Sequence, residues 1–401
     1  MKTTFYTVFI FMLVITGNVK SAVFSDSLEM KMSVNSEQGN PAQLKNYFFT
    51  EASYTGDICT NIIGGITTGT KYLGMANLKL GFDTEIAGLW KGGQFFINGA
   101  ATHGKSPSEF LVGDFQTVSN IDAGDHIYIH ELWYKHQFKR FEITFGLQDL
   151  NVEFAGSENG SMFINSSFGI PPVISDNIPA PIFPLTALGI TSKIEITDNI
   201  LLSAAVYDGC PTAFEHNLYN TNWHLSNNDG TLVLSELAWS KEFFKLSGTY
   251  KAGYYFHSGL TETDPETGAS AEVFDNNYGF YFIADQTVWE RSDREQSLGV
   301  FAQLALSPAS INTHHYYFGG GLNYSGISKK QPNDALGLAF ACAGFDHNTR
   351  KNETAIEMYY KKQICENLFF QPDVQFVINP AGTNEVLPNA LVGLLRFNIA
   401  F

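Results

Sequence analysis

The sequence predicts an all-β protein, a transmembrane antiparallel β-barrel of about 16 strands with an inward-folded constriction loop. Segments of about ten residues alternate between apolar and polar side chains along most of the chain. Their connections alternate between very short turns and long loops, as in outer-membrane barrels. The chain also ends on a strand-like segment whose apolar face consists of Gly393, Leu395, Phe397, Ile399 and Phe401.

The composition favours strands over helices. Among 401 residues there are 34 Phe, 18 Tyr and 36 Gly, and only 16% of the residues are charged, a mixture typical of strands and tight turns. No run of 18 apolar residues occurs beyond the N-terminus, which argues against membrane-spanning helices. The net charge of −16 argues against nucleic-acid binding, because no basic stripe is available to displace counterions from phosphates.

The N-terminus has the pattern of an export signal. Lys2 precedes an apolar core from Phe5 to Thr16, and small residues near Ser21 suit cleavage. The apolar core is too short for a transmembrane helix. We therefore expect three regions: a signal peptide at 1–22, an N-terminal periplasmic segment at 23–59 and an outer-membrane β-barrel at 60–401.

The four cysteines are not spaced like metal ligands. An exported chain permits disulfides, and four cysteines allow three pairings among which the sequence does not choose. Cys342 falls on the apolar face of a strand pattern, where a small buried hydrophobic residue is expected. The other three are Cys59, Cys210 and Cys365.

The strands can be placed in chain order. Residues 24–57 are mixed and polar, with a short helix expected around 41–50. Alternation begins at Thr60 and is clearest at 141–148, where Phe, Ile, Phe and Leu alternate with Glu, Thr, Gly and Gln. The sixteen strands are placed at 60–69, 72–83, 92–101, 126–137, 141–148, 188–197, 200–207, 231–239, 244–256, 278–289, 296–306, 315–325, 335–345, 354–364, 368–378 and 391–401.

The connections predict two different rims. Very short turns are expected at 139–140, 198–199, 241–242 and 366–367. Longer segments lie between them, at 102–125, 149–187, 208–230, 257–277, 346–353 and 379–390. In an outer-membrane barrel the short turns are periplasmic and the long loops extracellular.

Two residues fit this pattern poorly. Pro372 lies on the expected lipid face, where it removes one ladder hydrogen bond and suggests a bulge or an edge. His130 is expected to point toward lipid, between Tyr128 and Leu132. A phase error of one residue in strand 126–137 would move every side chain on it to the other face.

The longest connection, 149–187, is the most informative loop. It carries Phe154, Met162, Phe163, Ile164 and Phe168, a content too apolar for a disordered loop in solvent. A loop of this length is normally functional or disordered. We therefore expect it to fold inward, pack on the barrel wall and narrow the lumen.

Several stretches of the chain resemble a known family. They are Val112–Asn120, Glu131–Tyr134, Gly146–Phe154, Phe163–Gly169, Ala284–Gln286, Glu357–Tyr360 and Gln371–Pro380. On these stretches the chain resembles the carbohydrate-selective porins of the OprB family. The resemblance implies a sixteen-stranded barrel in the outer membrane of a Gram-negative bacterium that passes sugars, most of all monosaccharides, by diffusion. Pro372 belongs to one of these stretches.

The chain departs from the family pattern in its arginines. It has only five, and the segment 327–334 lacks one where the family tends to carry it. Related porins are also associated with arginine uptake. A porin that takes up a basic amino acid such as arginine is therefore the alternative function.

Sugar selectivity requires polar groups that replace hydration and aromatic faces that meet the apolar side of a pyranose. The candidate pore residues on inner faces and in the inward loop are Glu131, Trp133, Glu142, Glu153, Asn165, Phe168, Lys193, Glu195, Glu357, Asp373 and Arg396. Each is alternatively a solvated lumen residue without a role in selectivity. Arg396 is expected near Glu357 or Asp373, because their strands are neighbours, and such a set is alternatively an ion pair that stiffens the wall.

No catalytic, cofactor or metal pattern is found. The chain lacks a nucleophile elbow, a zinc-protease helix motif and a phosphate-binding loop. His314 and His315 are adjacent on a strand and face opposite ways, which disfavours one metal site. Rival functions from other classes are an outer-membrane phospholipase, which would need a Ser/His pair, and a plugged structural or adhesin barrel. The expected partners are outer-membrane lipid and a small hydrophilic solute, with the protein a monomer or a homotrimer.

The expected lumen is nearly neutral. Five inward acids, Glu131, Glu142, Glu195, Glu357 and Asp373, stand against six bases, Lys135, Lys193, Lys245, Lys251, Lys361 and Arg396. The excess acid would then lie in loops such as 257–277. We therefore expect only weak cation selectivity, which falls as salt screens the loops.

Overall fold

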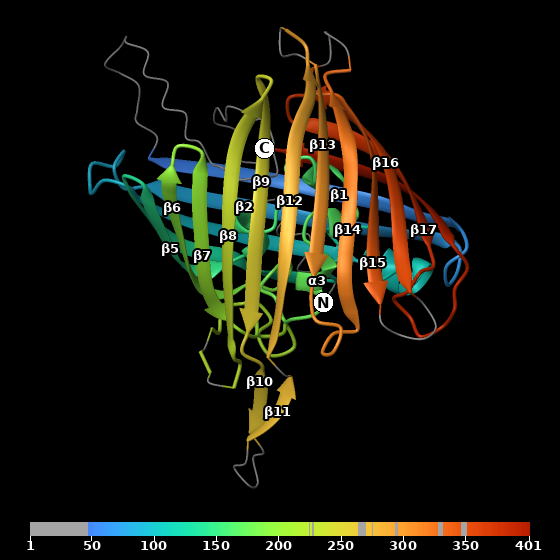
Figure 1. The fold of residues 1–401 in the computed structure, drawn as a ribbon, viewed down its shortest axis with the longest axis horizontal. Coiled ribbons are helices and arrows are strands. Elements are labelled where there is room, and N and C mark those ends of the chain that lie inside the picture. Colours follow the sequence, from blue (N-terminus) through green and yellow to red (C-terminus); the bar gives the residue numbers. More distant parts are fainter. Residues whose placement is uncertain are drawn as a thin grey trace, which may run out of the picture.

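Sixteen strands form one closed antiparallel barrel (Figure 1). The computed structural model describes residues 47–223, 225–226, 228–263, 270–274, 276–292, 296–327, 332–345 and 351–401. The expected signal peptide at 1–22 lies outside them. The strand order around the barrel is β1-β18-β17-β16-β15-β14-β13-β12-β9-β8-β7-β6-β5-β4-β3-β2, with β10-β11 as a separate hairpin. The all-β barrel predicted from the alternation is confirmed.

The strands match the expected positions closely after the first. Their bounds are β1 (Phe48–Ile63), β2 (Gly69–Asp83), β3 (Gly93–Gly104), β4 (His126–Phe138), β5 (Phe141–Gln148), β6 (Ala187–Thr197), β7 (Ile200–Asp208), β8 (Thr231–Phe243), β9 (Leu246–His257), β10 (Leu260–Thr263), β11 (Ser270–Phe274), β12 (Asn277–Glu290), β13 (Ser297–Leu306), β14 (His314–Ser325), β15 (Ala335–Phe345), β16 (Asn352–Cys365), β17 (Leu368–Ile378) and β18 (Ala390–Ala400). The short helices are η1 (Ser108–Val112), α2 (Leu150–Glu153), η2 (Gly160–Met162), η3 (Ser166–Phe168) and α3 (Pro172–Ser175). None of the helices in the described ranges is long and apolar enough to cross a membrane.

The first strand differs from its expected position. It runs over Phe48–Ile63 and not over 60–69, so residues 48–59 belong to the barrel and not to the preceding segment. Small or polar residues such as Thr50, Ala52 and Gly56 alternate there with inward polar residues such as Asp57, so the strand lacks a clear alternation of apolar and polar side chains. The expected helix at 41–50 is contradicted from Phe48 onward, where the backbone is extended.

The two rims differ as predicted. The turn rim carries the tight connections 139–140, 198–199, 244–245 and 366–367, and the opposite loop rim carries the long segments, including the β10–β11 hairpin that projects from the barrel in Figure 1. The β8–β9 turn was expected at 241–242. It lies instead at Phe244 and Lys245, whose positive φ values of 53° and 68° suit a tight hairpin turn.

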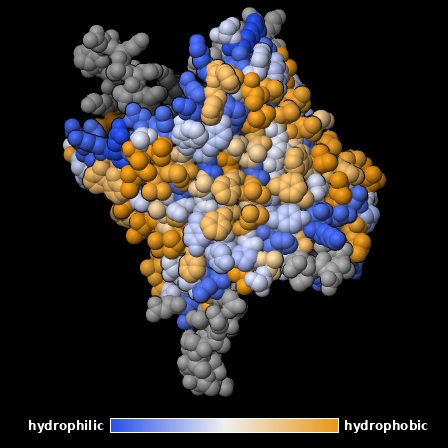
Figure 2. Space-filling model, viewed as in Figure 1, coloured by the Kyte–Doolittle hydropathy of each residue, from blue (hydrophilic) through white to orange (hydrophobic). Residues whose placement is uncertain are grey.

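The outer face of the barrel is apolar. Figure 2 shows apolar residues spread over the side of the barrel and the most hydrophilic residues gathered toward its ends. On β18 the predicted alternation holds, because Leu395 is 37% exposed on the outside and Leu394 is 4% exposed on the inside. Pro372 is exposed on the outer face of β17, as expected.

A β-bulge on β4 corrects the expected orientation of His130. Asn98 of β3 pairs with Glu131, and the next residue, Gly99, pairs with Ile129, so His130 is the extra residue. The bulge places His130 and Glu131 both inside the barrel, and Tyr128 with them. The phase expected for the second half of β4 was correct, and the phase of the first half was off by one residue.

The inward loop, residues 149–186, fills the lumen beside β7–β16. Phe154, Phe163 and Phe168 are at most 1% exposed and pack in one cluster with Tyr281 and Tyr359. These tyrosine rings lie over glycines on neighbouring strands, because a Cβ on Gly253 would lie 2.0 Å from Tyr281. Burial of each such aromatic side chain contributes about 1.5–3 kcal/mol. The loop therefore packs its aromatic side chains against the inner face of the barrel wall.

A buried ion pair closes the barrel between the first and last strands. Arg396 of β18 donates to Asp57 of β1 through Nε at 2.8 Å and Nη2 at 2.7 Å. The side chain of Asp57 is not exposed and that of Arg396 is 12% exposed. Glu357 and Asp373, which were expected to lie near Arg396, are on the other side of β18 from Asp57. The ion pair is therefore formed across the closing seam between β1 and β18. Arg396 also donates to Asn120 at 2.7 Å.

Breaking this pair should destabilise the barrel strongly. Asp57→Asn leaves the largely buried guanidinium without its counter-charge, which we expect to lower the free energy of unfolding by about 3–5 kcal/mol. Urea unfolding in detergent, followed by the heat-dependent shift on gels, measures this loss. The matched control is Glu51→Gln, which removes the partner of Lys79 at a more exposed pair and should cost at most about 1 kcal/mol. Equal losses in the two variants would contradict a special role for the seam.

Candidate functional site

Carboxylates on the barrel wall hold the segments that enter the lumen. Glu353 of β16 accepts hydrogen bonds from the backbone N–H groups of Phe115 at 2.7 Å, Gln116 at 2.9 Å and Ala381 at 2.7 Å. Its side chain is fully buried. By accepting from three N–H groups, this residue joins the second inward segment, 105–125, to the segment that follows β17.

The inward loop is anchored in the same way. Glu357 of β16 accepts from the N–H groups of Ile164 at 2.6 Å and Asn165 at 2.9 Å. Asp285 of β12 accepts from the Ser157 hydroxyl at 2.8 Å and from the Asn159 N–H at 2.9 Å. On β8, Glu236 accepts from the Ala155 N–H at 2.9 Å. These contacts hold the loop against β8–β16 and leave space along β1–β6.

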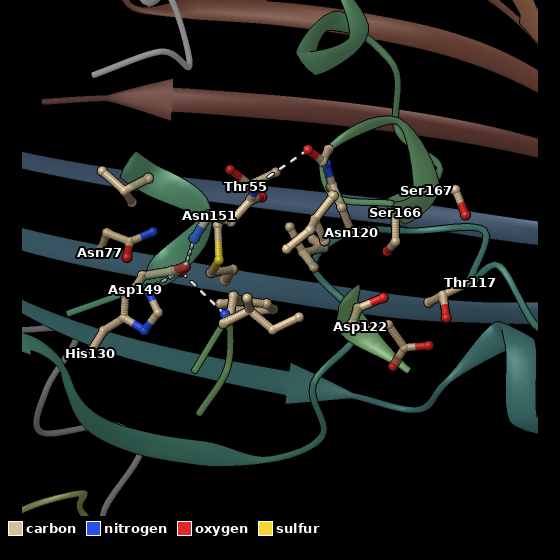
Figure 3. A pocket seen from close by; sticks show the side chains of 18 of the residues that line it. Thr55, Asn77, Thr117, Asn120, Asp122, His130, Asp149, Asn151, Ser166 and Ser167 are labelled. Atoms are coloured by element: carbon tan, nitrogen blue, oxygen red, sulfur yellow. Dashed lines mark hydrogen bonds and ion pairs between the residues drawn. The ribbon is translucent and has the colours of Figure 1, made fainter. Parts of the chain in front are cut away.

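Three cavities follow one another through that space. The outer cavity, of about 680 Å³, lies at the loop rim and includes Asp114; the central cavity, of about 520 Å³, lies between the inward loop and β1–β4; the inner cavity, of about 440 Å³, reaches the turn rim at Arg140. Figure 3 shows the central cavity, with Asn77, His130, Asp149 and Asn151 at one side of the view and Thr117, Asn120, Asp122 and Ser166 at the other.

The three cavities are neighbours that share lining residues, and we call this row of cavities the path. Thr117 and Asp122 line both the outer and the central cavity. Glu131, Asp149 and Val152 line both the central and the inner cavity. We call these last three residues the throat. The path therefore runs from the loop rim to the turn rim, past the start of the inward loop.

The throat is held rigidly. Asp149 caps α2 by accepting from the Asn151 N–H at 2.8 Å, and it also accepts from the Phe183 N–H at 3.2 Å. Its second oxygen lies 3.2 Å from His130 Nε2, the residue that the β4 bulge turns inward. Glu131 accepts from Trp133 Nε1 at 3.2 Å. Both throat acids therefore have fixed side chains.

Alternating charges line the inner cavity. Glu153 of α2 pairs with Lys193 of β6, which lies 3.9 Å from Glu142, and Glu142 lies 3.1 Å from Lys135. Burial alone would raise the pKa of Glu153, but the charges of Lys193 and Lys135 outweigh it and hold that pKa below its usual value. Glu153 therefore stays ionised, and the row of charges connects the loop to the wall.

Seven of the eleven candidate residues line this path. They are Glu131, Trp133, Glu142, Glu153, Lys193, Glu195 and Arg396. Trp133 stacks on Phe96 with ring centroids 4.7 Å apart, and Lys135 lies 5.3 Å from the same ring.

The other four candidates are buried away from the path. Asn165, Phe168, Glu357 and Asp373 lie between the inward loop and the wall, where they anchor or pack the loop. Sequence reasoning placed Glu357 and Asp373 on inner strand faces and Asn165 and Phe168 in the inward loop, but it had no signal for which half of the lumen the loop fills. It also missed Asp149, Asn77 and Asn98, although the Asp149-Leu-Asn151 sequence is an N-cap pattern.

The histidine pair and the cysteines have structural environments. Buried His314 makes a hydrogen bond between Nδ1 and the Gly344 carbonyl at 2.9 Å. No cluster of three or more metal-ligating side chains occurs within the described ranges. All four cysteines are free, and Cys342 is 4% exposed, as expected for a small buried residue.

The path is acidic, unlike the nearly neutral lumen expected from the sequence. Lys245 lies in a turn, and Lys251 is engaged behind the loop with Gly156 and Glu236. Seven bases line the three cavities: Lys79, Lys105, Lys135, Arg140, Lys193, Lys361 and Arg396. Twelve acids line them: Asp83, Glu85, Glu109, Asp114, Asp122, Asp125, Glu131, Glu142, Asp149, Glu153, Asp176 and Glu195.

Comparison with known proteins gives one family. The sequence model of one protein family, described as "Carbohydrate-selective porin, OprB family", matches residues 67–401. Porin B of Pseudomonas aeruginosa is 23% identical over 419 residues, covering 89% of this chain and 88% of that protein. A putative porin, QuiX, of Acinetobacter baylyi is 22% identical over 250 residues, covering 54% of this chain and 56% of that one.

Solved structures show the same fold. The high-pH structure of Pseudomonas putida OprB has a TM-score of 0.78 at 20% identity and covers 89% of this chain and 94% of its own. The low-pH structure of the same protein has a TM-score of 0.59 at 17% identity, with coverage of 89% and 93%.

The acid excess should make the pore prefer K⁺ over Cl⁻. Because Glu131 and Asp149 are 5% and 6% exposed, salt screens them less than loop charges, and the preference should persist at physiological ionic strength. The zero-current potential in a KCl gradient measures it. Glu131→Gln should lower the preference, whereas Glu366→Gln, at a turn outside the cavities, should leave it unchanged. Anion preference in the wild type would contradict this assignment of the path.

The cation preference should also depend on pH. Burial raises the pKa of Asp114 to about 6, and burial also raises the pKa of Asp122. Because these pKa values are raised, the groups favour folding at low pH and lose that contribution as pH rises through about 6. The outer cavity therefore loses negative charge below about pH 6, and the zero-current potential should fall there. Asp114→Asn should reduce this step, because only Asp122 then remains, and a step of unchanged size in that variant would refute it.

Proposed function

The chain belongs to the carbohydrate-selective porin family OprB, and from this premise we propose that monosaccharides cross through the three joined cavities, with the throat as the constriction. The protein is an outer-membrane porin of β-barrel fold. The observation that supports the route is the sharing of lining residues between successive cavities, most of all Glu131, Asp149 and Val152. It favours an open channel over a plugged adhesin barrel.

The chemistry of the central cavity suits neutral polar solutes. Its lining includes Ser53, Thr55, Asn77, Asn98 and Asn120, whose hydroxyl and amide groups can replace the water that a sugar loses on entry. The inner cavity adds the stacked Trp133 and Phe96 rings, which supply apolar surface. The family and fold are those of a channel and not of an enzyme.

A basic amino acid remains the alternative solute, because the path carries more acids than bases. However, the throat acids are already engaged, since Asp149 is bonded to His130 and two N–H groups and Glu131 to Trp133. Neither the family description nor the relatives' names mention an amino acid. Liposome swelling decides between the two: we expect faster swelling in hexoses than in arginine, and the reverse order would favour the alternative.

A larger side chain in the throat should slow sugar transport. Val152 is 39% exposed and faces the path from α2, so Val152→Trp should reduce hexose swelling rates severalfold and lower KCl conductance as well. The matched control is Val233→Trp, at an outward position of β8 with 38% exposure. Both variants should show the wild-type shift on gels. Wild-type transport in folded Val152→Trp would place the constriction elsewhere.

A further inference from the structure

The charged groups of the central cavity already have partners. Lys79 Nζ lies 3.0 Å from Glu51 Oε1, Arg396 is bonded to Asp57, and Asp149 lies 3.2 Å from His130. A passing solute would have to compete with these contacts. The neutral side chains of this cavity are therefore the groups that can form new hydrogen bonds with a solute.

Two asparagines of the central cavity differ from the others in having no such engagement. Asn98 of β3 is 4% exposed, lines the cavity, and its Oδ1 has no hydrogen-bond partner. Asn77 of β2 lines the same cavity, and no hydrogen bond is found for its side chain within the described ranges. By contrast, Asn120 accepts from Arg396 and Asn398 donates to Thr55 at 2.8 Å.

The strand register places these two amides together. Asn98 is opposite Lys79 and Asn77 is opposite Ala100 on the paired strands β2 and β3. Asn77 and Asn98 are therefore diagonal neighbours on the inner face, about 7–8 Å apart at the backbone. Asn98 is also the register partner of Glu131, so the pair lies directly on the outer side of the throat. In Figure 3, Asn77 lies at the same side of the cavity as Asp149 and His130.

An amide suits a sugar better than it suits an ion. Its NH₂ group donates and its carbonyl accepts, whereas a carboxylate only accepts and a lysine only donates. A sugar hydroxyl also does both, so each amide can exchange two hydrogen bonds with neighbouring hydroxyls. A buried amide without a hydrogen-bond partner costs free energy. A sugar hydroxyl that forms a hydrogen bond with the amide removes this cost.

We propose that Asn77 and Asn98 form a binding subsite for neighbouring hydroxyl groups of a monosaccharide, on the outer side of the throat. The inference rests on the proposed sugar route and adds to it that the solute is retained briefly before the throat. Transport should therefore saturate with sugar concentration, and a bound sugar should reduce the ion current of a single channel.

The test is a D-glucose titration of single-channel current in planar bilayers. Asn98→Leu has nearly the same volume but no polar atom, and it should raise the half-saturation concentration about fivefold to tenfold, as expected for the loss of neutral hydrogen bonds. The variant should show the wild-type shift on gels, which establishes that its barrel is folded. The control is Asn398→Leu, which changes the same cavity at an amide already bonded to Thr55 and should shift the half-saturation much less.

A second measurement uses only the wild-type protein. Deoxyhexoses that lack one of two neighbouring hydroxyls should require higher concentrations than D-glucose to reduce the current. Equal shifts in the two leucine variants, or equal potency of the deoxyhexoses, would overturn the subsite. Liposome swelling distinguishes the subsite from the sugar route. Glucose-driven swelling without saturable current block refutes the subsite alone, whereas no swelling in any sugar refutes the proposed route.

Discussion

The arrangement of the lumen depends on hydrogen bonds between wall carboxylates and the backbone of the inward segments. Such segments leave the sheet, so their N–H groups lose the ladder partners that a strand would supply. The carboxyl oxygens of Glu353, Glu357, Asp285 and Glu236 accept hydrogen bonds from these N–H groups. All four lie on β8–β16, and their position determines which half of the barrel is filled. The path along β1–β6 is what remains.

This use of acids explains why charge counting from the sequence failed. Glu357 and Asp373 were counted as lumen charges, but both are buried against the loop. Asp57 is likewise paired with Arg396 at the closing seam. Meanwhile acids such as Asp149 and Asp114 sit in loops, and the fold brings them to the path. An inner-face residue faces either water or a loop, and period-two alternation does not distinguish the two.

The strands themselves were largely readable, because one face meets lipid and the other does not. Strand β5 is typical, with Phe145 outward and Thr144 inward. The failures have local causes: small and polar outward residues hide β1, and the single extra residue His130 shifts the phase of β4. Contacts such as Ile164 with Glu357 join residues 193 positions apart. No periodic pattern encodes pairings of that kind.

The off-centre path divides the chain into two parts with different freedom to vary. Most of its lining comes from residues between Ser53 and Leu201, a contiguous stretch of the gene, while β8–β16 mainly carry the packed half. Exchange of that one stretch between homologues would carry a solute preference with it. The remaining strands would act as a shared frame. Barrels of one type could in this way come to transport different solutes.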